Sequence, residues 1–168
     1  MNVDEEDYGT DFEDGERNGW ENDIGSPDGI LKTEEGPVGP NTFWSGKLEW
    51  RPPRTFLPSL AKMLPLLPGG EQDIHRFFVS FRYRVHPLEP GEATTIGVVL
   101  TANVSLGHYA FWIDEHTPTG KWLNSDPASV SFYGNRGHIL IGSHYGDGPG
   151  VSRKIDIDDI KALSFSKK

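Results

Sequence analysis

Strict alternation of apolar and polar residues in one long segment constrains the fold of this chain more than any other feature. Residues 74–86 read IHRFFVSFRYRVH. Every second position holds an apolar side chain: Phe77, Val79, Phe81, Tyr83 and Val85. Successive side chains of a strand point to opposite faces, so this period predicts a long strand with one buried face. We therefore expect a body built mainly from β-strands.

Further strands follow from the same alternation, or from runs of β-branched and aromatic residues. The segments are 43–50, 94–106, 109–113, 129–133, 138–142 and 154–157. The residues GNRG between the fourth and fifth of them predict a hairpin. Residues 158–163 fit either a helical turn or a further strand. With 20 glycines and 13 prolines, the composition also favours many turns.

One short helix is predicted early in the chain, over residues 55–64. Pro52 and Pro53 end the strand before it, because proline donates no hydrogen bond to a ladder. The apolar positions fall on one helical stripe: Phe56, Leu57, Leu60, Met63, Leu64 and Leu67. The fold class is thus mainly β, or α+β. We expect an antiparallel sheet, sandwich or jelly-roll-like barrel of six to seven strands, with this helix packed on the face that carries Phe77.

The charge divides the chain into three expected parts. Residues 1–40 carry 13 acidic and 2 basic side chains, whereas the remainder carries 12 acidic and 14 basic ones. Dense like charge opposes collapse, so residues 1–24 are predicted to be a disordered acidic arm. Residues 25–41 are rich in glycine and proline and are expected to be a linker. Residues 42–168 then form a single globular domain.

Two groups of residues are candidates for partner binding. The aromatic residues of the arm are potential anchors: Tyr8, Phe12 and Trp20. The basic side chains of the body form a potential stripe: Lys47, Arg51, Arg54, Arg82 and Arg84. Together with Phe78, Trp112 and Trp122, the stripe is a candidate for weak contact with nucleic acid or an anionic membrane. The alternative is that it is the solvated polar face of a half-buried strand.

No catalytic or metal-binding motif stands out. There are no cysteines, and none of the six histidines is paired at helical spacing. We therefore expect no catalytic residues, no metal and no cofactor, and we identify no small-molecule substrate. The alternative is a small hydrolase or isomerase, which would require residues distant in the sequence to meet around one pocket: His116, His138, His144, Asp114 and Asp147.

Two viral families resemble parts of the sequence. Residues 43–67, a strand followed by an Arg/Pro corner and a helix, resemble the start of the globular domain of rhabdovirus-type matrix proteins. That resemblance implies a protein that self-associates and links a nucleocapsid to a membrane. Residues 107–115, GHYAFWIDE, are similar to the core of plant-virus movement proteins and jelly-roll coat proteins.

These observations favour a non-enzymatic, self-associating assembly protein, matrix-like or of the movement or coat type. Its acidic arm is expected to bind a second copy or another protein. The N-terminus lacks the apolar core of a signal peptide, so we expect an intracellular location, in the host cytoplasm, under a membrane or in a virion.

Overall fold

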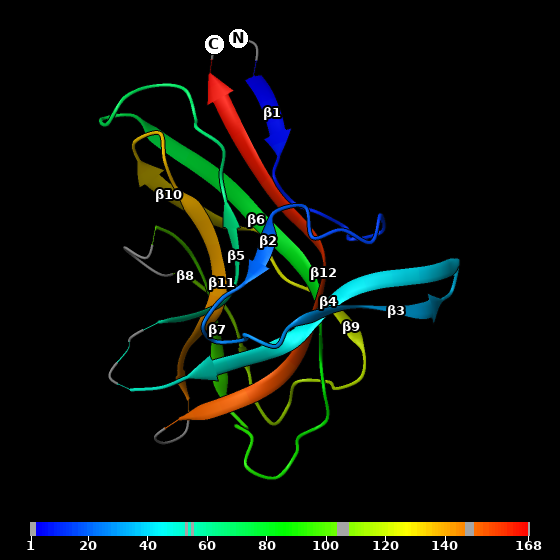
Figure 1. Ribbon diagram of the computed structural model, residues 1–168. Coiled ribbons are helices and arrows are strands. Elements are labelled where there is room, and N and C mark those ends of the chain that lie inside the picture. Colours follow the sequence, from blue (N-terminus) through cyan, green and yellow to red (C-terminus); the bar gives the residue numbers. More distant parts are fainter. Residues whose placement is uncertain (1–2, 53, 55, 104–107, 147–149, 168) are drawn as a thin grey trace.

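The computed structural model describes residues 3–52, 54, 56–103, 108–146 and 150–167. In these residues the chain forms two antiparallel β-sheets that pack face to face as a sandwich (Figure 1). The described residues contain no helix, and hence none that is long and apolar enough to cross a membrane. The fold class predicted from the alternation is therefore confirmed as an antiparallel β-sandwich.

The seven-stranded sheet has the strand order β10-β6-β12-β4-β3, with β9 beside β6 and β1 beside β12. Its strands are β1 (Val3–Asp7), β3 (Ile30–Gly36), β4 (Gly39–Trp50), β6 (Ile74–Val85), β9 (Trp122–Asn124), β10 (Ala128–Tyr133) and β12 (Val151–Lys167). The last strand, β12, lies in the middle of this sheet, and it runs beside β1, so that both ends of the chain lie at one edge of the molecule (Figure 1).

The five-stranded sheet has the order β2-β5-β11-β7-β8. Its strands are β2 (Trp20–Asn22), β5 (Leu57–Met63), β7 (Ile96–Ala102), β8 (His108–Ile113) and β11 (His138–Gly146). The inner faces of the two sheets enclose the core. The inward side chains of β6 are buried as the alternation predicted, and they meet residues such as Leu100 and Ile141 of the other sheet.

The predicted helix over residues 55–64 is wrong. Leu57–Met63 is a strand, which pairs with β11 on one side and β2 on the other. Pro58 and Pro65 leave too few uninterrupted residues for a stable helix. The apolar spacing that suggested a helix comes instead from a strand that is covered on both faces. The four residues from Leu57 to Leu60 are all buried, whereas Met63 is exposed. Residue 55, where the predicted helix was to begin, lies outside the described residues.

The predicted hairpin between residues 129–133 and 138–142 is also wrong, although both segments are strands. β10 pairs with β6 in the seven-stranded sheet, whereas β11 pairs with β5 and β7 in the other. The four residues between them carry the chain from one sheet to the other. The C-terminal strand is longer than expected and includes residues 158–163, which settles the choice between helical turn and strand.

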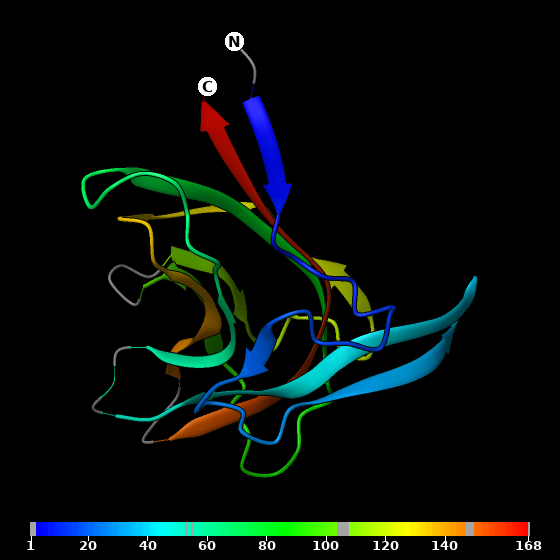
Figure 2. The ribbon, with the colours of Figure 1, turned by 45° about the horizontal axis from the view of Figure 1, so that its top comes forward.

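The acidic N-terminal segment packs on the body, which differs from the expected disordered arm. β1 pairs with β12, and Phe12 and Trp20 are fully buried in the core. The indole Nε1 of Trp20 donates to the carbonyl oxygen of Tyr8 at 3.1 Å, and the Tyr8 ring meets Phe77 edge-on. The hydrophobic energy of burying these aromatic rings offsets the repulsion between the neighbouring acids. The expected linker likewise contributes β3, whose hairpin with β4 projects from the sandwich (Figure 2).

Candidate functional site

The outer face of the five-stranded sheet carries the candidate site. Cross-strand neighbours share a face, so the register identifies the side chains that point away from the core. Glu21 of β2 pairs with Ala61 of β5, which pairs with Leu140 of β11, which in turn pairs with Thr101 of β7. All four lie opposite to the face that carries Leu60 and Ile141 in the core.

A groove of about 480 Å³ opens on this face, over β2, β5 and β11. Its floor is apolar and consists of Pro58, Ala61 and Leu140, and Leu140 is only 2% exposed although it points outward. Its rim is polar, with the Glu21 carboxylate on one side and His138 on the other. The combination of an apolar floor with a few converging polar groups is typical of ligand-binding sites.

Trp112 extends the same face toward β8. It pairs with Gly97 of β7, and Gly97 pairs with His144 of β11. Gly97 is itself buried, and the Trp112 indole and the His144 imidazole belong to the residues that pair with it on either side. Trp112 is 44% exposed. It lies two strands from β11, which corresponds to about 10 Å across the sheet.

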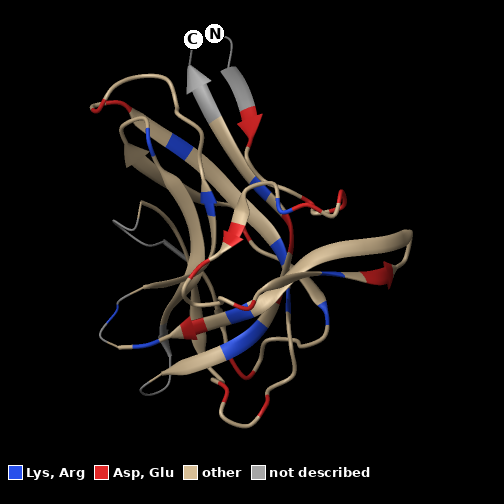
Figure 3. Cartoon of the chain, in the orientation of Figure 1, with Lys and Arg blue, Asp and Glu red and all other residues tan. Residues whose placement is uncertain are grey.

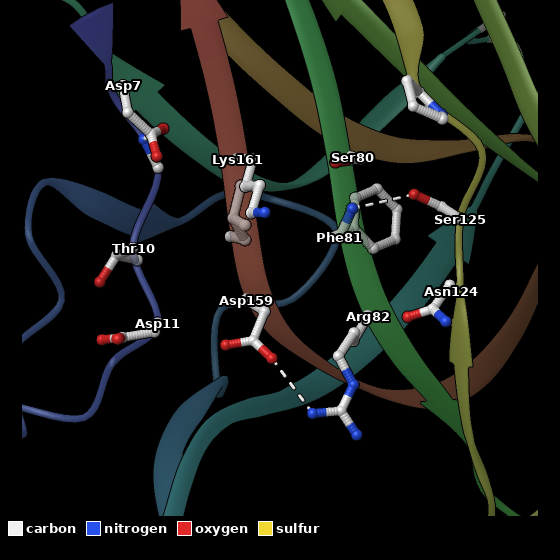
Figure 4. A pocket seen from close by; sticks show the side chains of 13 residues that line it. Asp7, Thr10, Asp11, Ser80, Phe81, Arg82, Asn124, Ser125, Asp159 and Lys161 are labelled. Atoms are coloured by element: carbon white, nitrogen blue, oxygen red, sulfur yellow. Dashed lines mark hydrogen bonds and ion pairs between the residues drawn. The ribbon is translucent and has the colours of Figure 1, made fainter.

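A second and larger pocket, of about 620 Å³, lies on the outer face of the seven-stranded sheet (Figure 4). It is bounded by the residues before and after Thr10, by β6, and by the bulge of β12. Asp159 and Arg82 point toward one another at its centre and form an ion pair of 3.1 Å. Asn124 stands beyond Arg82, on the side away from Asp11 (Figure 4). The lining is therefore mainly polar, and its central charges satisfy each other.

Arg84 is the centre of a closed cluster on the same sheet. Its guanidinium donates two hydrogen bonds to the Glu34 carboxylate, at 2.8 and 3.0 Å, and a third to Asp156 at 2.9 Å. It also lies over the rings of Trp122 and Phe43, at 4.5 and 4.9 Å from their centroids. Glu34 belongs to β3 and Phe43 to β4, whereas Asp156 belongs to β12 and Trp122 to β9. Through these contacts Arg84 holds the β3–β4 hairpin against the rest of the sheet.

Asp158 is an unusual buried acid at the bulge of β12. Its Oδ1 accepts from the backbone N–H of Asp159, but its Oδ2 has no hydrogen-bond partner. Burial, with a contribution from the charges of Asp159 and Glu13, raises the pKa of Asp158 from the ordinary 3.8 to about 6. A buried carboxylate with one unsatisfied oxygen is costly, so the site favours a proton or a cation. Among the described residues no group of three or more His, Cys, Asp or Glu side chains is placed to hold a metal ion.

The histidines and carboxylates considered for catalysis do not meet. His138 and His144 lie on one strand, six residues apart, which is about 20 Å. His116 is exposed in the turn after β8, where its backbone N–H donates to Asp114. Asp147 lies outside the described residues. Among the described residues, these candidate side chains do not gather around one pocket, as the enzyme alternative requires.

The basic residues predicted to form one stripe are divided between the seven-stranded sheet and the loop that joins β4 to β5. Lys47, Arg82 and Arg84 share the outer face of the seven-stranded sheet, and both arginines are engaged in ion pairs. Arg51 and Arg54 are exposed in the loop, where Arg54 lines the groove on the other sheet. The stripe is interrupted because Lys47 lies on β4 whereas the two arginines lie on β6. Strand β12, with its acidic side chains, lies between these two strands.

The groove itself was not identified from the sequence. Its walls come from residues around positions 21, 61 and 140, and only the strand register brings these together. Trp112 was grouped with the basic stripe, but it belongs to the opposite sheet. The available signal was the alternation in 94–106, which places Gly97 and Thr101 on one face of a strand.

Comparison with known proteins gives a likeness at the level of the fold. No protein-family model and no curated protein matches the sequence. Among solved structures, the chain is similar to the CBM22-1 xylan-binding domain from Paenibacillus barcinonensis Xyn10C, with a TM-score of 0.58 and 12% identity over 97% of this chain and 96% of that one. It is also similar to a carbohydrate-binding module specific for non-crystalline cellulose, CBM28, with a TM-score of 0.50 and 16% identity over 91% of each chain.

These neighbours overturn the viral interpretation. Both of these structural neighbours are carbohydrate-binding modules and neither is a viral protein, so the resemblances to matrix proteins and to movement or coat proteins are wrong. The predicted partners are wrong for the same reason: a second copy of the chain, nucleic acid and an anionic membrane. Short motifs such as those at 43–67 and 107–115 also occur in unrelated β-proteins.

Proposed function

We propose that this protein is a carbohydrate-binding module that binds a polysaccharide chain along the outer face of its five-stranded sheet. The groove over β2, β5 and β11, continued toward Trp112, is the observation on which the proposal rests. The fold neighbours are a xylan-binding domain and a module specific for non-crystalline cellulose, and these two polysaccharides are the first ligands to test.

The chemistry of the face suits a sugar chain. A pyranose ring has an apolar face of C–H groups and a rim of hydroxyls that donate and accept hydrogen bonds. The apolar floor around Ala61 and Leu140 can contact the C–H groups, while Glu21, Arg54 and His138 supply acceptors and donors for the hydroxyls. The exposed indole of Trp112 offers a flat surface on which a second ring can stack.

Binding rather than catalysis is the proposed activity. Hydrolysis of a glycosidic bond uses two carboxyl groups on opposite sides of the bond. On the groove, the described carboxylates come from one short stretch of chain, Glu21 and Asp23, and the opposite wall presents His138. The module would therefore hold a polysaccharide without cleaving it, and incubation with xylan should release no new reducing ends.

Affinity electrophoresis and isothermal titration calorimetry test the proposal directly. The native protein should be retarded in gels that contain xylan or soluble cellulose derivatives. Trp112→Ala should weaken binding by about tenfold or more, because aromatic anchors contribute about 2 kcal/mol in binding sites. Tyr133→Ala is the matched control, since Tyr133 is a 68% exposed aromatic residue on the other sheet. The proposal fails if no polysaccharide in a broad neutral panel binds, or if both variants behave alike.

A further inference from the structure

A third groove, of about 340 Å³, lies on the outer face of the seven-stranded sheet, opposite to the sheet that carries Trp112. It crosses three neighbouring strands. Lys32 of β3, Lys47 of β4 and Lys154 of β12 line it, together with His86 just beyond β6. Basic positions on these three strands are blue in Figure 3. We call this the lysine groove.

Two of these lysines face each other directly. In the register of β4 and β12, Lys47 is paired with Lys154. Side chains in such a pair start about 5 Å apart, and like charges there repel. A protein with a net charge of −9 has acidic side chains in excess, yet this groove gathers three ammonium groups. An anion bound between them would remove the repulsion.

Neighbouring acids neutralise the groove only in part. The Lys154 ammonium bonds both oxygens of Glu89 at 2.9 Å, and His86 contacts the Asp156 carboxylate at 2.8 Å. Lys47 is only loosely paired, with its ammonium 3.8 Å from Glu49. Lys32 has no ion pair among the described residues. Lys32 and Lys47 are therefore the two cations with capacity for an added anion.

Other residues in the groove define the kind of anion. Asp28 lines it and would repel a continuous chain of phosphates, but it can accept a hydrogen bond from a hydroxyl. The side chain of Ile30 is 51% exposed and offers an apolar contact. We infer that the lysine groove binds an acidic sugar residue of a polysaccharide, whose carboxylate or sulfate group lies between Lys32 and Lys47. This inference does not depend on the proposed function of the opposite sheet.

The experiment uses four polymers: polygalacturonate, dextran sulfate, neutral dextran and a single-stranded oligonucleotide. Affinity electrophoresis at low salt should show retardation by at least one of the two acidic glycans and none by dextran. Lys32→Gln and Lys47→Gln should each weaken that binding about two- to fivefold, as expected for exposed charge pairs. Preference between polygalacturonate and dextran sulfate assigns the group as a carboxylate or a sulfate.

Lys161→Gln is the matched control, because Lys161 is an exposed lysine on the same sheet outside the groove. It should change binding less than either groove variant. The inference is overturned if neither acidic glycan binds, if Lys161→Gln weakens binding equally, or if the oligonucleotide binds as tightly as the glycans. Trp112→Ala should leave binding of the acidic glycans intact. Failure to bind neutral polysaccharides would thus refute only the proposed function.

Discussion

Replacing Trp20 by alanine tests whether the acidic N-terminal segment is part of the core. Trp20 is fully buried, and its Nε1–H donates to the Tyr8 carbonyl at 3.1 Å. Removal of a buried tryptophan side chain costs about 3–5 kcal/mol, and the lost hydrogen bond adds about 1 kcal/mol. We expect the free energy of unfolding to fall by about 4–6 kcal/mol. The midpoint of thermal unfolding should fall by about 8–24 °C.

Urea unfolding followed by far-UV circular dichroism measures this change without relying on the fluorescence that the substitution removes. Trp112→Ala is the control, because it deletes the same side chain from an exposed position, and it should cost less than about 1 kcal/mol. If Trp20→Ala changes the free energy of unfolding by less than about 0.5 kcal/mol, a value typical of surface sites, then the segment is not held in the core. The disordered arm expected from its charge would then be correct.

Three further changes probe other parts of the structure. Leu60→Ala should lower the free energy of unfolding by about 2–5 kcal/mol in urea titrations, because Leu60 is fully buried, whereas Met63→Ala should be neutral. Asp158 has a higher pKa in the folded protein, about 6, than its ordinary 3.8, so its contribution to stability grows as the pH falls from about 6 to about 4. Measured in EDTA, Asp158→Asn should raise the free energy of unfolding at pH 8 by about 1–3 kcal/mol and have little effect at pH 4. A second measurement adds Ca²⁺. If Ca²⁺ raises the Tm of the native protein but not of the variant, a cation rather than a proton neutralises this carboxylate. Glu34→Gln should loosen the β3–β4 hairpin from Arg84 and speed amide hydrogen exchange in β3 several-fold, while exchange in β7 stays unchanged.

The strands were predictable from the sequence where one face is buried and the other polar, as in 74–86, because the alternation follows from that asymmetry. Residues 57–63 were not, because both faces of β5 are covered at Leu57–Leu60 and the alternation disappears. The assignment of strands to sheets was also beyond local patterns. Residues 133 and 138 are near in sequence, yet their strands belong to different sheets.

The candidate site was less predictable than the fold. A groove across β2, β5 and β11 depends on which residues stand opposite one another, and the pairing of Ala61 with Leu140 is set by contacts far apart in the chain. The acidic composition of residues 1–24 predicted disorder, because composition does not show which aromatic rings find a place in the core. The acidic residues at 1–24 surround Phe12 and Trp20, and the burial of these two rings outweighs the composition around them.

The central place of β12 also has a kinetic consequence. One side of this strand pairs with β4 and then β1, and the other with β6, so that Val3 stands opposite Lys167. Each of these pairings closes a long loop, and the chain loses the entropy of closing that loop before the stabilising contacts form. Folding is therefore slow, in the range of milliseconds to seconds. Until β12 is inserted, β4 and β6 present unpaired edges that can join other chains. A chain shortened before residue 151 should therefore aggregate on refolding instead of forming a smaller sandwich.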